Sequence, residues 1–319
     1  NKMTAENQTN KLIRNVFLSF FLKKLVISIF IFARMCYNTN TKIIRSLFME
    51  TKIIDLYDYY KLAKPEGARG ILTTYVHYMS GEISLTRKLP AMLVIPGGAY
   101  WMVSDREAEP VALKFFAEGF NAFVLNYSVA GDSAVKYPYQ LIEAEMAVAY
   151  IRQNAEELHV DPDQIAAVGF SAGGHLCAML GSCDNCPDTG DIFKPQVSVK
   201  PNAVILSYPV ITRDDKVGHV DSFKNLCGAE NIELQNKVDI LNIINEKSAP
   251  AFIWSTFTDN AVPCDNALLA ALKYRESGVP VSVHVFGKGE HGLSVADMTV
   301  YGDRHVVDEI GRASCRERV

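Results

Sequence analysis

A serine set between two glycines follows a short apolar run near the middle of the chain. Residues 165–168 form the run, and the turn after them reads Gly169-Phe170-Ser171-Ala172-Gly173 before a stretch of small residues. A sharp turn from a strand into a helix strains the backbone of such a serine, and glycines two positions away leave room for it. The pentapeptide also fits an ordinary packing turn between a strand and a helix. We therefore assign Ser171 as a catalytic nucleophile together with the features below.

A glycine-rich segment upstream follows a second apolar run. Residues 93–95 lead into Pro96-Gly97-Gly98-Ala99-Tyr100, where backbone N–H groups can turn towards one point. A tetrahedral oxyanion requires donors that are fixed in advance. We assign the oxyanion hole to the N–H of Gly98 or Ala99 together with that of Ala172. Because Ala99 has a Cβ, it can serve only if its backbone keeps an ordinary φ, and the choice between Gly98 and Ala99 stays open.

Two further strand-like runs each end beside a residue that can complete a catalytic triad. Residues 251–257 end close to Asp259, and residues 281–286 lead into a glycine-flanked loop that carries His291. The order serine, acid, histidine along the chain is the order in serine hydrolases with an open α/β sheet. We assign Asp259 as the acid and His291 as the general base.

The competing acids and histidines lack this setting. Asp214, Asp215 and Asp239 lie in a polar stretch with no apolar strand before them, whereas active-site loops gather at the carboxyl ends of strands. His175 is one turn into the helix after Ser171, too close to act as its base, so we expect it to pack. The remaining histidines lie in strand-like runs, polar loops or a predicted helix: His77, His159, His219, His284 and His305.

The three side chains predict a defined reaction. His291 takes the proton of Ser171 as general base and returns it to the leaving oxygen, while Asp259 fixes the imidazole tautomer and stabilises the imidazolium. Water then repeats the cycle on the acyl-enzyme. This chemistry requires no metal and no cofactor, and none is expected.

Several segments together resemble a known group of enzymes. They are residues 96–100, 107–119, 124–128, 161–162, 169–175 and 289–294. They look like the α/β-hydrolase esterases of the acetylxylan esterase and hormone-sensitive-lipase-like group of bacterial carbohydrate esterases. The likeness runs from about Lys52 to Asp308. It implies the α/β-hydrolase fold and hydrolysis of carboxylic esters, commonly deacetylation of xylan-derived sugars, with Ser171, Asp259 and His291 in the triad. The chain departs from the group's His-Gly-Gly-Gly motif at Pro96 and Ala99.

Strand-like and helix-like runs alternate through most of the chain. Strands are predicted over residues 70–78 (an edge strand), 91–95, 122–127, 165–170, 203–208, 252–257 and 281–286, and helices over 107–118, 139–158, 172–180 and 264–276. This alternation predicts an α/β fold, a mostly parallel, doubly wound sheet flanked by helices. Residues 210–247 are polar and poorly patterned, and we expect a small cap-like insertion there that shapes substrate entry.

Composition favours one soluble catalytic domain. With 319 residues and 49% apolar content, the chain can bury one large core. The formal net charge is −4, but residues 1–48 hold eight Lys/Arg and one Glu and the last eleven hold three Arg and two Glu, so residues 49–308 carry −12. An acidic body without a basic stripe argues against nucleic acid as a partner.

The two ends are expected to lie outside the catalytic domain, residues 49–308. We predict that translation begins at Met49, with Met35 the second choice, and that residues 1–48 are a non-native extension. Their apolar part, residues 16–32, is broken by Lys23-Lys24, and each mid-span charge costs about 2.5–3.5 kcal/mol in a bilayer. Residues 309–319 read like a translated sequencing adapter. No membrane partner and a cytoplasmic location are expected; if residues 1–48 are genuine, secretion, membrane anchoring or lipidation at Cys36 is the alternative.

Cysteine usage fits a reducing compartment. Five cysteines lie outside the two ends, without regular spacing, so no disulfide framework is predicted. Cys183 and Cys186 form a lone C-x-x-C with no second ligand pair, and no zinc site is expected.

The preferred hypothesis is a serine carboxylesterase acting on short-chain esters, in particular acetyl esters of oligosaccharides from plant polysaccharides. Tyr100 and Trp101 follow the oxyanion glycines and are predicted to bind substrate as walls of a narrow acyl pocket. The alternatives are an arylformamidase-like amide hydrolase, a peptidase, and a catalytically silent binding protein on a hydrolase scaffold. The partner is a small acylated substrate, and the oligomeric state is left open.

Overall fold

A computed structural model describes residues 49–187, 189, 192–297 and 299–300. The chain divides after Met49, and everything described below lies in the second unit, Glu50–Val319. The predicted extension, Cys36, His305 and residues 309–319 lie outside the described residues.

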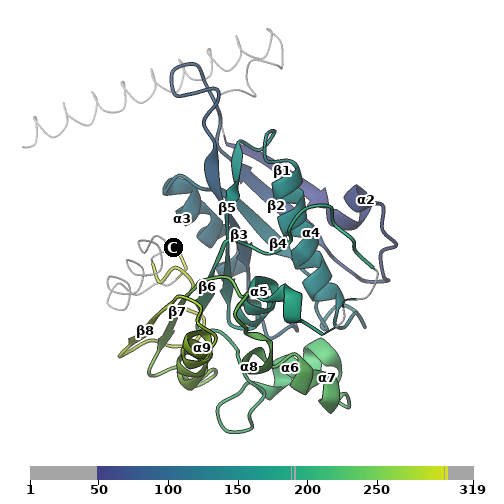
Figure 1. The fold of residues 1–319 in the computed structure, drawn as a ribbon, viewed down its shortest axis with the longest axis vertical. Helices are drawn as coiled ribbons and strands as arrows, with labels where there is room; N and C mark the ends of the chain where they lie inside the picture. Colours follow the sequence, from purple (N-terminus) through teal and green to yellow (C-terminus); the bar gives the residue numbers. More distant parts are fainter. Residues whose placement is uncertain (1–48, 188, 190–191, 298, 301–319) are drawn as a thin grey trace, which may run out of the picture. The chain divides into compact units, whose positions relative to one another are not determined.

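One sheet runs through the described part, with the strand order β1-β2-β4-β3-β5-β6-β7-β8 (Figure 1). The strands are β1 Glu50–Asp55, β2 Ile71–Val76, β3 Leu89–Ile95, β4 Asn121–Asn126, β5 Val160–Phe170, β6 Ala203–Ser207, β7 Ala251–Thr256 and β8 Val281–Phe286. β2 pairs antiparallel with both β1 and β4, and every pairing from β4 to β8 is parallel. The mostly parallel α/β-hydrolase sheet is therefore confirmed.

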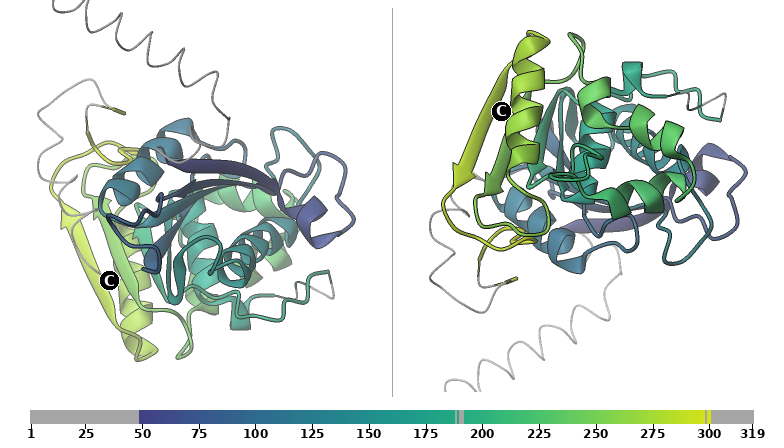
Figure 2. Two further views of the ribbon diagram at one scale, coloured as in Figure 1. Left: turned by 90° about the horizontal axis from the view of Figure 1, so that it is seen from above. Right: turned by 90° about the horizontal axis from the view of Figure 1, so that it is seen from below.

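Helices cover both faces of this sheet, as Figures 1 and 2 show. They are α2 Leu56–Tyr60, α3 Glu109–Ala117, α4 Tyr139–Gln153, α5 Ala172–Gly181, α6 Val220–Cys227, α7 Ile232–Lys237, α8 Ile240–Ile243 and α9 Asp265–Glu276, with 3-10 turns η2 Asp105–Glu107 and η3 Cys183–Asn185. The chain alternates strand and helix because each parallel crossover carries its helix over one face.

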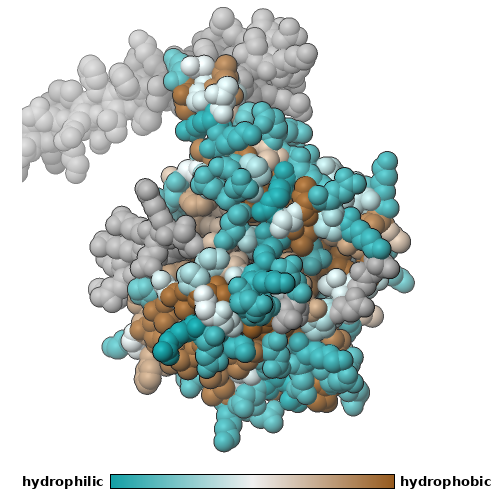
Figure 3. Space-filling view, in the orientation of Figure 1, coloured by the Kyte–Doolittle hydropathy of each residue, from teal (hydrophilic) through white to brown (hydrophobic). Residues whose placement is uncertain are grey.

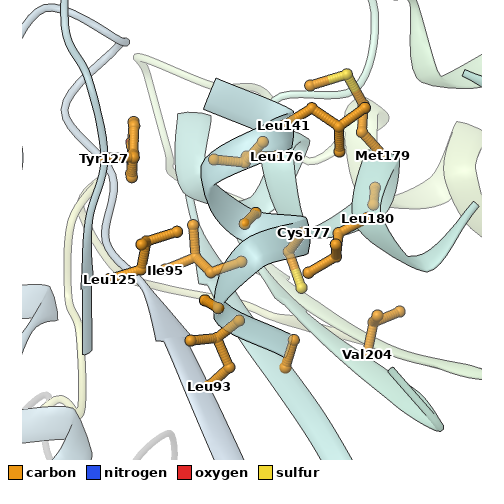
Figure 4. Close-up of a cluster of buried hydrophobic side chains, with 14 of the residues drawn as sticks. Leu93, Ile95, Leu125, Tyr127, Leu141, Leu176, Cys177, Met179, Leu180 and Val204 are labelled. Atoms are coloured by element: carbon orange, nitrogen blue, oxygen red, sulfur yellow. The ribbon is translucent and has the colours of Figure 1, made fainter. Parts of the chain in front are cut away.

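The strands are apolar on both sides because both faces are covered. β3 sends Leu93 and Ile95 into the larger core, which α4, α5 and α9 complete, and Met92 and Val94 into a second core beneath α3. Figure 4 shows the first of these cores, where Leu93 and Ile95 lie opposite side chains of α5.

One expectation about the sheet needs correction. The predicted edge strand 70–78 is interior, since β1 pairs along β2 from Glu50 to Asp55. β1 is short and carries charged residues, so its pattern is weak. The insertion at 210–247 contains α6, α7 and α8, and buries Phe223, Leu226 and Val238 in the larger core. Although residues 210–247 are polar overall, their helices have an amphipathic face that packs against the core.

Apolar side chains also gather on the surface over α9 and β8, at the lower left of Figure 3. The exposed apolar residues on these elements are Leu268, Leu272, Val283 and Val285. Among the described helices, none combines the length and apolar character that crossing a bilayer requires.

Candidate active site

Ser171 lies at the turn between β5 and α5 with a strained backbone. Its φ of 52° and ψ of −119° are rare for a residue with a Cβ. The N–H of Ser171 donates to the carbonyl of Ser207 at 3.0 Å, and its own carbonyl accepts from the N–H of Val210 at 3.0 Å. Because β6 and the segment after it hold both sides of the peptide, the strained turn is fixed by long-range contacts.

The flanking glycines permit close approach of main chains at this turn. A Cβ on Gly169 would lie 2.2 Å from the carbonyl oxygen of Gly173, and a Cβ on Gly173 would lie 2.2 Å from that of Ile95. Both distances are far below van der Waals contact, and the obstructing atoms are backbone. The sequence Gly-x-Ser-x-Gly is therefore required by the packing of α5 against β5 and β3.

The three predicted catalytic side chains meet at the carboxyl ends of β5, β7 and β8. His291 Nε2 lies 2.8 Å from Ser171 Oγ, and His291 Nδ1 lies 2.7 Å from Asp259 Oδ2. Asp259 Oδ1 accepts the N–H groups of Ala261 and Val262, each at 2.9 Å. With Nδ1–H directed to Asp259, Nε2 is free to accept the proton of Ser171.

The side chain of Asp259 is fully buried, and that of His291 is 24% exposed. The carboxylate is thus held in one orientation by three hydrogen bonds, whereas the imidazole edge is open to a reactant. This arrangement can move a proton from the serine to a leaving group.

Two of the competing acids, Asp239 and Asp214, have other partners. Asp239 Oδ2 accepts from the hydroxyl of Thr212 at 2.7 Å, and its Oδ1 accepts from the N–H of Leu241 at the start of α8. Asp214 caps its own turn by accepting from the N–H of Lys216. Neither carboxyl is bonded to His291.

The segment after β3 has an unusual backbone. Gly98, Ala99 and Tyr100 have φ values of 122°, 55° and 56°. The sequence argument makes Ala99 a donor only with an ordinary φ, and the structure does not meet that condition. The condition is too strict, because packing can hold one alanine in the left-handed region at a cost of roughly 1–2 kcal/mol.

Three N–H groups of the predicted oxyanion hole are without acceptors. Within the described residues, the main-chain N–H groups of Gly98, Ala99 and Ala172 donate no hydrogen bond. A Cβ on Gly97 would lie 2.9 Å from the Cβ of Ser171, so this loop runs directly against the nucleophile. Unpaired donors beside a nucleophile are available to an oxyanion.

Tyr100 does not have the setting predicted for it. Its side chain is 1% exposed, and its hydroxyl lies 2.8 Å from His175 Nδ1. His175 Nε2 lies 2.9 Å from the carbonyl of Val238, which only accepts, so Nε2 carries the proton and Tyr100 donates to Nδ1. Burial lowers the pKa of His175 to about 4, which keeps the ring neutral.

The prediction that Tyr100 lines the acyl pocket is therefore corrected, since the left-handed backbone turns its ring inward. Tyr100 instead ties the oxyanion segment to α5 and to the insertion. Trp101 is 57% exposed beside it and stays available to a substrate.

Two residues near the site were not singled out by the sequence, Glu107 and Tyr208. Glu107 Oε2 accepts from the N–H of Gly97 at 2.8 Å, and its Oε1 accepts from the hydroxyl of Tyr208 at 2.7 Å. Burial raises the pKa of Glu107, and these two hydrogen bonds oppose that shift. Sequence could not locate this pair, because a glutamate at the start of a helix ordinarily points to solvent.

The described residues contain no cluster of three or more side chains suited to binding a metal ion. The thiols of Cys177, Cys183, Cys186, Cys227 and Cys264 are free.

Comparison with known proteins adds an independent line of information. The family model described as BD-FAE matches residues 82–273. That range includes Ser171 and Asp259 and ends before His291.

Two curated relatives and one solved structure are similar to the chain. Endo-1,4-beta-xylanase B of Butyrivibrio fibrisolvens is 38% identical over 66% of this chain and 33% of its own length. The acetylxylan esterase of Xylanibacter ruminicola is 28% identical over 68% of this chain and 44% of its own length. The chain thus spans less than half of either relative. The acetyl ester-xyloside bifunctional hydrolase of Caldicellulosiruptor lactoaceticus has a TM-score of 0.67 and 33% identity, covering 79% of this chain and 91% of that one.

Proposed function

The chain belongs to the BD-FAE family of α/β-hydrolases. We propose that it is a serine carboxylesterase that forms its acyl-enzyme on Ser171. The observation that carries the proposal is the unbroken hydrogen-bonded path from Ser171 Oγ through His291 to Asp259, at 2.8 and 2.7 Å. An imidazole held between a hydroxyl and a buried carboxylate is the arrangement that general-base activation of serine requires.

The reaction then proceeds in two halves. Ser171 Oγ attacks the ester carbonyl carbon while His291 Nε2 takes its proton, and the carbonyl oxygen becomes an oxyanion. The N–H groups of Gly98 or Ala99 and of Ala172 stabilise this charge. The C–O bond to the alcohol breaks as Nε2 returns the proton to the leaving oxygen. Water, deprotonated by His291, then hydrolyses the acyl-enzyme and restores Ser171.

We assign the substrate class as short acyl esters, in particular acetyl esters of oligosaccharides from plant polysaccharides. Two of the similar proteins are named as acetyl ester hydrolases, one for acetylxylan and one for acetyl ester and xyloside. The exposed Trp101 beside the oxyanion segment offers an apolar surface, and the insertion after β6 offers polar groups such as the half-buried His219. An apolar pocket separates acyl chains by about 1–3 kcal/mol per methylene.

A hydrolysis panel tests the substrate class. The full chain is assayed on p-nitrophenyl acetate, butyrate and octanoate and on acetylated xylo-oligosaccharide. We expect kcat/KM for acetate to exceed that for octanoate by at least about a hundredfold, with acetate released from the oligosaccharide. Equal or faster turnover of octanoate would indicate a lipase-like enzyme. Faster turnover of an N-formyl aryl amide would instead favour the amide hydrolase.

The nucleophile is tested separately. Ser171→Ala should lose several orders of magnitude in kcat and all labelling by a fluorophosphonate probe. More than about a tenth of the wild-type kcat in this variant would refute the assignment. Absence of probe labelling in the wild-type protein would support the silent binding protein.

A further inference from the structure

A buried carboxyl joins the two loops that meet at Ser171. Glu107 is 3% exposed and lies in η2, between the oxyanion segment and α3. Its two carboxyl hydrogen bonds go to none of the three proposed catalytic side chains, yet both of them reach segments that carry the site.

One oxygen of Glu107 holds the oxyanion segment. Oε2 accepts the N–H of Gly97, the residue immediately before Gly98. A Cβ on Gly97 would lie 2.7 Å from that same Oε2 and 2.9 Å from the Cβ of Ser171. The carboxyl and the nucleophile therefore both pack closely against Gly97, and a shift of the carboxyl would displace the donors that follow it.

The other oxygen reaches the histidine loop through Tyr208. The hydroxyl of Tyr208 donates to Glu107 Oε1 at 2.7 Å and accepts from the N–H of Ser294 at 2.8 Å. The Tyr208 ring meets the ring of His291 edge-on, with centroids 5.1 Å apart. A Cβ on Gly292 would lie 3.9 Å from Oε1, which places the carboxyl against the same loop.

The directions of these bonds show how Glu107 connects the two loops. An N–H can only donate, so Ser294 uses a lone pair of the Tyr208 oxygen and the Tyr208 proton points to Glu107. Both carboxyl oxygens then act as acceptors, one for each of the two loops.

We propose that Glu107 is a positioning residue that, through Gly97 on one side and Tyr208 on the other, holds the oxyanion donors and His291 in register around Ser171. The inference rests on the proposed function, because register matters only if these groups act on one reacting carbonyl. Small displacements of such groups are costly, since preorganised donors act over hydrogen-bond distances.

The test compares the Glu107–Tyr208 pair with a second glutamate–tyrosine pair, Glu109 and Tyr75. Glu107→Gln and Tyr208→Phe are made singly and together. The control is Glu109→Gln, two residues away, whose carboxyl is exposed and accepts from the hydroxyl of Tyr75 at 3.3 Å, remote from the triad. An amide at position 107 offers one acceptor oxygen where the carboxyl offers two, so it keeps both contacts only if the Tyr208 hydroxyl turns its proton away and accepts from the amide instead.

Activity is counted per functional site. Each protein is titrated to completion with a fluorophosphonate, and kcat and KM for p-nitrophenyl acetate are expressed per labelled serine. We expect Glu107→Gln to lose about tenfold or more in kcat with KM changed less than about threefold, as for outer partners of other catalytic groups. The double variant should lose less than the product of the single losses, because the two residues act as one network. Glu109→Gln should stay within about twofold of wild type.

The outcomes separate the two proposals. If the labelled fraction of Glu107→Gln falls while kcat per labelled serine stays at the wild-type value, the residue is only structural and the inference is wrong. Should that variant not fold, Tyr208→Phe decides by the same measure. Activity retained in Ser171→Ala would overturn the proposed function itself, whatever position 107 does.

Discussion

The side-chain amide of Asn225, in α6, donates a hydrogen bond of 2.9 Å to the carbonyl oxygen of Ala99. The insertion after β6 therefore supports the oxyanion segment, 126 residues earlier in the chain, at a residue whose φ is 55°. The insertion predicted to form a cap therefore supports the backbone of the site.

We expect Asn225→Ala to reduce kcat by about threefold to tenfold, because one hydrogen bond contributes roughly 0.5–1.5 kcal/mol and Ala99 loses its anchor. Asn225→Asp should be worse, since a carboxylate faces the carbonyl oxygen. The measurement is steady-state hydrolysis of p-nitrophenyl acetate. Lys224→Ala is the control, because its exposed ion pair with Asp221 contributes little. Equal effects at 224 and 225 would contradict the proposed support.

The acid of the triad is tested by two aspartates. Asp259→Asn should fold normally but lower kcat by about 10⁴, because the amide favours the wrong His291 tautomer. Asp239→Asn should keep kcat and lose about 1 kcal/mol of stability, because an amide that keeps the N-cap of α8 no longer has the second oxygen that accepts from the Thr212 hydroxyl and the Arg213 N–H. Kinetics and thermal unfolding of both variants give the answer. The reverse pattern would move the acid to position 239.

The close packing at the elbow predicts contrasting effects of adding one methyl group. Gly173→Ala places a Cβ 2.2 Å from the Ile95 carbonyl oxygen and 2.3 Å from that of Pro96, and the backbone there cannot move aside. We expect a loss of about 3 kcal/mol or more in unfolding free energy, or failure to fold, with loss of probe labelling. Gly287→Ala meets nothing within 4 Å and should be neutral. Denaturant unfolding measures both, and a stable, labelled Gly173→Ala protein would contradict this packing.

A buried carboxyl on α4 predicts a pH dependence of stability. Burial raises the pKa of Glu145 from 4.5 to about 7. The folded protein therefore holds a proton that the unfolded chain has released, so this contribution to stability is full below pH 4.5 and is lost as pH rises through 7.

Glu145→Gln removes that loss, so its stability relative to wild type should rise between pH 5 and pH 8, by up to about 3 kcal/mol. Thermal unfolding at several pH values measures the difference. Glu156→Gln is the control, because its carboxyl is exposed beside Lys88, which lowers its pKa and reverses the sign. A Glu145→Gln difference that is independent of pH would show that the carboxyl is not titrating in this window.

Local patterns were sufficient for much of the architecture. The run 203–208 is predicted as a strand and observed as β6, Ala203–Ser207, and the helix predicted at 139–158 begins at Tyr139 and ends at Gln153. Strands that are buried on both faces have continuous apolar sequences, which can be recognised without a structure. β1 was missed because a strand at the edge needs no such run.

The sequence by itself determined the order of strands and helices. It also determined which serine, aspartate and histidine follow which strand. Both are local properties, because they depend on the spacing of apolar residues and glycines along the chain. Only the tertiary structure decided that Ala99 takes a left-handed φ, that Tyr100 turns inward to His175, and that Glu107 is buried between Gly97 and Tyr208. These features depend on contacts between segments as much as 126 residues apart, as for Asn225 and Ala99. Such contacts form only when the parallel strands bring their carboxyl ends to one edge of the sheet.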